Sequence, residues 1–140
     1  IMAIKMRVLY ATGKGKLINM AGLLKQEFEL ATNAVDKIPP AYSCDKERLL
    51  VLVMTLKGDL EDQVRLFCKE INKNRAQNTA LIVDGTPEDA AKLAGILKEA
   101  GTNVIEDIHY VKGGLPFIKK VSDDEKSALM AWAHKVVDSL

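Results

Sequence analysis

Runs of consecutive apolar residues alternate along the chain with segments whose apolar residues recur every three or four positions. The continuous runs predict buried strands, because a strand covered on both faces carries apolar side chains on both. They lie at residues 6–10, 49–54 and 80–83, with a shorter candidate at 33–38 and a fifth at 103–110. Pro39 and Pro40 end the shorter candidate, because proline lacks the N–H that a strand ladder needs.

Helical spacing of apolar residues marks four further segments. They lie at residues 17–28, 60–71, 87–100 and 123–140. Thr86 and Pro87 predict the start of the third helix as its N-cap and first residue, and Gly101 predicts its end. Ser122 and Glu125 form a capping box, which predicts the start of the last helix.

This alternation predicts an α/β protein with a parallel sheet and right-handed crossovers. A length of 140 residues suits one domain, so residues 1–140 are expected to form a single unit. Five strands fit the doubly wound order 2-1-3-4-5. In that order a ligand crevice lies at the carboxyl ends of strands one and three. We expect residues 12–16, 55–59 and 84–87 to build it.

The charges of the chain nearly cancel, since 20 lysines and arginines face 19 aspartates and glutamates. Nucleic acids and acidic membranes require concentrated positive charge, so neither is an expected partner. The apolar runs are also shorter than a membrane-crossing helix needs. Cys44 and Cys68 lack the spacing of a zinc site or a redox dithiol, and this cysteine usage fits a cytoplasmic protein.

A glycine- and lysine-rich loop at residues 11–16 follows the first predicted strand and precedes the first predicted helix. The N–H groups at the start of a helix lack partners within the helix, and the helix dipole favours negative charge there. Glycines let the backbone approach a phosphate closely. The loop is a candidate anion site, with an ordinary turn as the alternative. Tyr10 and Leu17 exclude a Walker A motif, which needs Gly and Ser or Thr there.

Residues 8–21 resemble the opening strand, phosphate loop and first helix of short-chain flavodoxins, including Met20 and Ala21 early in the helix. Residues 110–117 and the final helix are similar to the corresponding segments of flavodoxin-like proteins. The resemblance to the flavodoxin family covers nearly the whole chain. It implies a flavodoxin-like three-layer α/β/α sandwich with a five-stranded parallel sheet. It also implies non-covalently bound flavin mononucleotide (FMN) and electron transfer to a redox partner protein.

The resemblance further implies which residues contact the cofactor. The phosphate loop would comprise Thr12, Gly13, Lys14, Gly15, Lys16 and Leu17. The flavin ring would be lined by Met54, Thr55, Leu56 and Lys57 on one side and by Asp84, Gly85 and Thr86 on the other. The family's loop reads Thr/Ser-x-Thr-Gly-x-Thr, and Lys14 and Leu17 replace two of its hydroxyl residues. Lysines can hold phosphate as point charges, whereas the usual stacking aromatics are missing from both ring loops.

Two classes of function follow. The leading hypothesis is an FMN-binding electron carrier, because the sequence shows no catalytic pairing of nucleophile and base. The alternative is a flavin-free flavodoxin-like module that binds another anion or a protein partner, motivated by the missing hydroxyls and aromatics. A reductase that uses flavin on an added substrate is not separable from a carrier by sequence. A monomer or a weak homodimer is expected.

Residues 112–120 combine two glycines with apolar residues and lysines. With Leu115, Phe117 and Ile118 exposed, this segment would be a docking surface with a basic rim. Alternatively these three residues fold back under the last helix, as apolar residues ahead of a helix commonly do. The sequence favours the second interpretation.

Overall fold

The computed structural model describes residues 4–140, so residues 1–3 of the predicted domain lie outside the described residues. Strands and helices occur in the predicted order along the chain. The strands are β1 (Met6–Ala11), β2 (Val35–Lys37), β3 (Glu47–Thr55), β4 (Ala76–Asp84), β5 (Asn103–Val104) and β6 (His109–Tyr110). The helices are α1 (Gly15–Glu27), α2 (Asp62–Lys69), α3 (Pro87–Ala100) and α4 (Asp123–Asp138), with a 3-10 turn at Thr32–Ala34. Each helix formed by residues 4–140 is too short or too polar to cross a bilayer.

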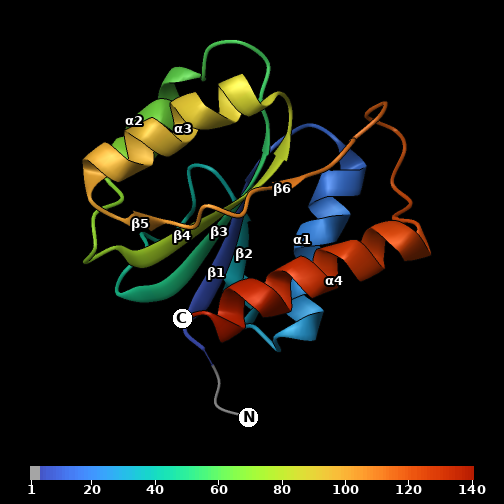
Figure 1. Ribbon diagram of the computed structural model, residues 1–140, viewed down its shortest axis with the longest axis horizontal. Helices are drawn as coiled ribbons and strands as arrows, with labels where there is room; N and C mark the ends of the chain where they lie inside the picture. Colours follow the sequence, from blue (N-terminus) through green and yellow to red (C-terminus); the bar gives the residue numbers. More distant parts are fainter. Residues whose placement is uncertain (1–3) are drawn as a thin grey trace.

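The strands of the described chain form one parallel sheet in the order β2-β1-β3-β4-β5, with β6 also paired to β4. Helices α1 and α4 cover one face of the sheet, and α2 and α3 cover the other (Figure 1). The predicted α/β class and strand order are confirmed. Because the winding direction reverses between β1 and β3, the carboxyl ends of these strands lie side by side, with Ala11 opposite Met54.

The fifth strand differs from the prediction, because residues 103–110 pair with β4 in two short pieces. Between the two paired pieces, β4 advances by three residues, from Thr79 to Ile82, whereas the edge strand advances by five, from Val104 to His109. In the intervening stretch the Asp107 carbonyl accepts a hydrogen bond from Trp132 Nε1 at 2.6 Å. This bond holds the interrupted stretch against α4. Extra residues of this kind are common at sheet edges, where one side of the strand has no ladder to complete.

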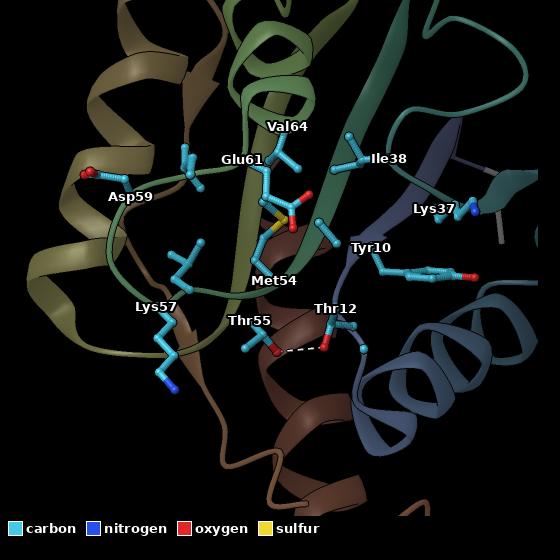
Figure 2. A pocket seen from close by; sticks show the side chains of 14 residues that line it. Tyr10, Thr12, Lys37, Ile38, Met54, Thr55, Lys57, Asp59, Glu61 and Val64 are labelled. Atoms are coloured by element: carbon cyan, nitrogen blue, oxygen red, sulfur yellow. Dashed lines mark hydrogen bonds between the residues drawn. The ribbon is translucent and has the colours of Figure 1, made fainter. Parts of the chain in front are cut away.

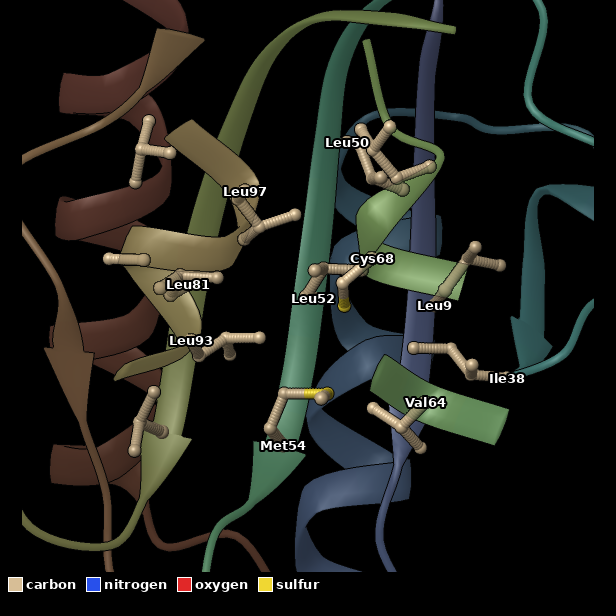
Figure 3. Packing of buried hydrophobic residues seen from close by; sticks show 14 of the residues in the cluster. Leu9, Ile38, Leu50, Leu52, Met54, Val64, Cys68, Leu81, Leu93 and Leu97 are labelled. Carbon is tan, nitrogen blue, oxygen red and sulfur yellow. The ribbon is translucent and has the colours of Figure 1, made fainter. Parts of the chain in front are cut away.

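Alternate residues of the central strands supply two apolar cores, one under each layer of helices. Leu52 and Met54 of β3 lie in the core beneath α2 and α3, together with Leu93 (Figure 3). Val51 and Val53 lie in the core beneath α1 and α4. Burying a leucine side chain stabilises a fold by about 1.5–3 kcal/mol. The two cores therefore fix the strand ends on which the predicted crevice is built.

Side-chain caps fix where two helices begin. The Thr86 hydroxyl accepts from a backbone N–H of the first turn of α3 at 3.1 Å. Ser122 and Glu125 form the predicted capping box, in which each side chain accepts from the other residue's N–H at 3.1 Å. Both predicted caps are confirmed. Because α3 begins directly after Thr86, Gly85 and Thr86 alone connect it to β4.

The segment before α4 does not fold back as the sequence analysis favoured. Leu115, Phe117 and Ile118 are 56%, 75% and 38% exposed, so the interpretation that they pack beneath α4 is wrong. The inner face of α4 is already filled by buried Leu129 and Trp132, which contact the sheet core. The segment instead runs across the start of α1, visible as the orange loop of Figure 1.

Burial lowers the pKa of His109, although the Asp107 carboxylate acts in the opposite direction. The imidazole stacks on Trp132 with ring centroids 5.4 Å apart. A lowered folded-state pKa means that the unfolded chain binds more protons, so stability is lost as pH falls through about 6.5. We expect His109→Gln to reduce the loss in free energy of unfolding between about pH 7 and pH 5, measured by urea denaturation. Equal losses in both proteins would contradict this expectation.

Candidate functional site

The carboxyl ends of β1, β3 and β4 bring the three predicted loops together. Thr55 is opposite Asp84 in the β3–β4 ladder, and Thr12 directly follows β1. The Thr12 and Thr55 hydroxyls lie 2.7 Å apart in a hydrogen bond (Figure 2), and Thr55 Oγ1 donates to Asp84 Oδ2 at 3.5 Å. The Thr12 hydroxyl also accepts from the Lys14 N–H at 3.0 Å. A chain of hydrogen bonds therefore crosses the three strand ends and finishes on the Asp84 carboxylate.

The same carboxylate neutralises Lys14. Lys14 Nζ lies 2.6 Å from Asp84 Oδ2, and the two side chains are 26% and 17% exposed. Solvent and salt screen a partly buried pair less than a pair on the open surface. The Lys14 ammonium, which the resemblance assigns to a phosphate, therefore has its counter-charge within the chain.

The second loop lysine is paired as well. Lys16 Nζ lies 3.0 Å from Glu125 Oε2 in the first turn of α4. The Ser122 N–H, and to a smaller extent the Lys16 ammonium, lower the pKa of Glu125. The Glu125 carboxylate is therefore charged at neutral pH and holds Lys16 against α4.

Residues 113–119 pack over the glycine- and lysine-rich loop and the start of α1. The Gly15 N–H, the first of α1, donates to the Pro116 carbonyl at 3.3 Å. Gly113 is buried, and a Cβ placed there would lie 2.7 Å from Asp84 Oδ2. A larger residue at position 113 would have to displace the side chains of Asp84 and its neighbours. The segment thus occupies space through which a ligand would reach the amino end of α1.

The loops after β3 and β4 touch each other. The Leu56 N–H donates to the Asp84 carbonyl at 3.0 Å, and a Cβ at Gly85 would lie 2.8 Å from the Leu56 carbonyl oxygen. The Thr86 side chain is committed to capping α3. These contacts narrow the space between the two loops, which is where the resemblance places the flavin ring.

A cleft of about 450 Å³ opens beside these loops, between the carboxyl ends of β1, β2 and β3 and the start of α2. Its lining includes these predicted site residues: Thr12, Gly13, Met54, Thr55, Leu56 and Lys57. Lys37, Ile38, Glu61 and Val64 also line it and were not predicted. The order 2-1-3-4-5 places the end of β2 at this rim, which could have identified the first two. Lys37 and Lys57 face Asp59 and Glu61 in the lining of this cleft (Figure 2), so its charges balance.

The remaining predicted site residues lie outside the lining of this cleft. Lys14, Lys16 and Asp84 are in ion pairs, Gly15 begins α1, Gly85 and Thr86 form the short connection to α3, and Leu17 is fully buried. Tyr10 is half-buried and contributes both to the core and to the cleft. Within residues 4–140, no group of three or more His, Cys, Asp or Glu side chains is arranged to hold a metal ion.

Comparison with known proteins agrees with the architecture. None of the known protein-family models matches the sequence, and no curated protein is similar to it in sequence. Among solved structures, a flavodoxin from the domain Archaea superposes with a TM-score of 0.61 and 14% identity, over 95% of this chain and 99% of that one. The fold of this chain is flavodoxin-like. At this identity the likeness establishes the fold alone.

FMN does not fit the crevice of this flavodoxin-like fold as the chain builds it. Of the two replaced hydroxyl positions, Lys14 is paired with Asp84 and Leu17 is buried in the core. A phosphate at the start of α1 would lie among the Asp84 and Glu125 carboxylates that already hold the lysines. Leu56 lies against Gly85, which narrows the space between the loops after β3 and β4 where the ring would lie.

A pair of alanine variants tests whether residues 113–119 pack against the loop. A Cβ at Gly113 would lie 2.9 Å from Leu17 Cδ1, whereas a Cβ at Gly13 would meet no atom of the described residues within 4 Å. We expect Gly113→Ala to lower the free energy of unfolding by about 1–3 kcal/mol through overpacking. The matched Gly13→Ala should change it by less than about 0.5 kcal/mol. If urea denaturation gives both variants the same stability, the segment does not close the loop.

Proposed function

We propose that this chain works as a flavin-free, flavodoxin-like module that binds a protein partner at the carboxyl edge of its sheet. The observation that carries the proposal is the closed phosphate loop. Lys14 and Lys16 are paired with Asp84 and Glu125, and the Gly15 N–H is bonded to a carbonyl of residues 113–119. Both lysine charges and the first N–H group of α1, which a phosphate would use, are therefore paired within the chain.

Electrostatics favour this closed state over a phosphate-bound one. A phosphate monoester carries about −1.5 to −2 charges near pH 7. If a phosphate formed ion pairs with Lys14 and Lys16, the carboxylates of Asp84 and Glu125 would lose their partners. They would also lie close to the negative phosphate. Leaving a partly buried charge without its partner is costly, and like charges at such distances repel. The two lysines therefore stabilise the closed loop and are not available to bind an anion.

An FMN-binding electron carrier is the second candidate. Its support is the likeness to an archaeal flavodoxin over 95% of this chain, together with the cleft at the ends of β1 and β3. In this function Lys14 and Lys16 would hold the phosphate, and a redox partner would accept the electron. Residues 113–119 would have to leave the start of α1, and the loops after β3 and β4 would have to separate.

Titration with FMN separates the two candidates. The fluorescence and the visible absorption of FMN are followed as protein is added. We expect neither quenching nor a spectral shift at protein concentrations up to about 1 mM, because the phosphate loop is closed and the ring space is narrowed. Saturable quenching at micromolar protein would establish the carrier instead, provided that Lys14→Glu abolishes it. The matched Lys98→Glu, on the exposed side of α3, controls for a change in net charge alone.

A further inference from the structure

Exposed apolar side chains gather in one short stretch of the chain. Six large apolar side chains are exposed in the part of the chain that the structure describes. Four of them fall within residues 110–118: Tyr110 at 44%, Leu115 at 56%, Phe117 at 75% and Ile118 at 38%. Scattered apolar residues are ordinary on a protein surface, but a local cluster marks an interaction site.

The backbone that carries this cluster is held in place. Gly113 is buried against the loop after β1, and the Pro116 carbonyl accepts from the Gly15 N–H. The Lys119 carbonyl accepts from Asn19 Nδ2 at 2.7 Å, which fixes the far end of the segment on α1. A surface whose backbone is already ordered loses less conformational entropy on binding, so its apolar side chains contribute more of their burial to affinity.

Lysines border the cluster. Lys112, Lys119 and Lys120 are exposed and form no ion pair within residues 4–140. Asp123 and Asp124 follow in the first turn of α4, where the helix N-terminus stabilises negative charge. Free positive charge around an apolar centre is complementary to acidic groups on a partner.

We propose that residues 112–120 are a docking surface for a protein segment that combines apolar and acidic side chains. Phe117 is the central anchor, with Leu115 and Ile118 beside it, and Lys112 and Lys120 receive the acidic groups. The docking surface rests on the proposed function, because it names where the partner binds and what chemistry it carries. Asp123 and Asp124 follow Lys119 and Lys120 closely in the chain and would repel an anionic bilayer, whereas a narrow protein segment can contact the lysines alone.

Selection of random short peptides on the immobilised full chain tests this surface without a known partner. We expect the enriched peptides to carry aromatic or aliphatic residues next to Asp or Glu. Fluorescence anisotropy of an enriched peptide then gives its dissociation constant for the parent chain and its variants. Phe117→Ser should weaken binding about tenfold or more, as loss of an aromatic anchor does. Lys120→Glu should weaken binding as well, and more at low salt than at high salt.

Matched controls lie on the opposite layer of helices. Leu66→Ser on α2 removes an exposed apolar side chain with the same 56% exposure as Leu115, and Lys98→Glu on α3 makes the same charge change as Lys120→Glu. Both control variants should bind the peptide as the parent does. All four substituted residues are largely exposed, so circular dichroism is expected to show folded proteins in each case.

Five results would overturn the docking surface, and four of them concern peptides and vesicles. They are a selection that enriches no peptide, peptides without acidic residues, equal binding by the parent and Phe117→Ser, and sedimentation of the parent chain with phosphatidylserine vesicles that Phe117→Ser abolishes. Self-association of the parent that is lost in Phe117→Ser would also overturn it, because a second copy would then occupy the surface. FMN binding would contradict the flavin-free proposal, whereas the peptide and vesicle measurements contain no FMN and report on the docking surface alone, so the two failures are distinguishable.

Discussion

The ion pair between Lys14 and Asp84 ties the loop after β1 to the end of β4, and the arrangement of the whole carboxyl edge depends on it. Asp84 Oδ2 lies 2.6 Å from Lys14 Nζ and within 3.5 Å of the Thr55 hydroxyl, which is itself bonded to Thr12. The pair thus ends a continuous polar path across three strands. Gly113 packs against the same carboxylate, so the pair also supports the segment that runs over α1.

The fold of this chain does not by itself determine what binds at the ends of its strands. The sheet order and the two layers of helices are those of a flavodoxin-like protein, and the likeness to an archaeal flavodoxin extends over nearly the full chain. A fold provides positions at its strand ends, but the side chains at those positions decide what binds there. In this chain the positions near α1 hold internal counter-charges, and the exposed apolar surface lies a few residues away, on residues 110–118.

Sequence patterns predicted what depends on neighbours along the chain. The continuous apolar run of β3 and the capping box of Ser122 are local signals, and the structure confirms both. The pairing of Lys14 with Asp84 joins residues far apart in sequence, so no local spacing encodes it. The exposure of Phe117 depends on whether the inner face of α4 has room, and that face is filled by side chains such as Trp132. Both features are decided by tertiary packing, which a single sequence does not reveal.

A double-mutant cycle on the Lys14–Asp84 pair tests the closed loop most directly. Lys14→Met, Asp84→Asn and the double variant are compared with the parent chain by urea denaturation. We predict a favourable coupling energy on the order of 1 kcal/mol, because both side chains are partly buried and their charges are incompletely screened. A coupling energy indistinguishable from zero would mean that Asp84 does not hold Lys14, which would leave the ammonium available to an anion and contradict the closed phosphate loop.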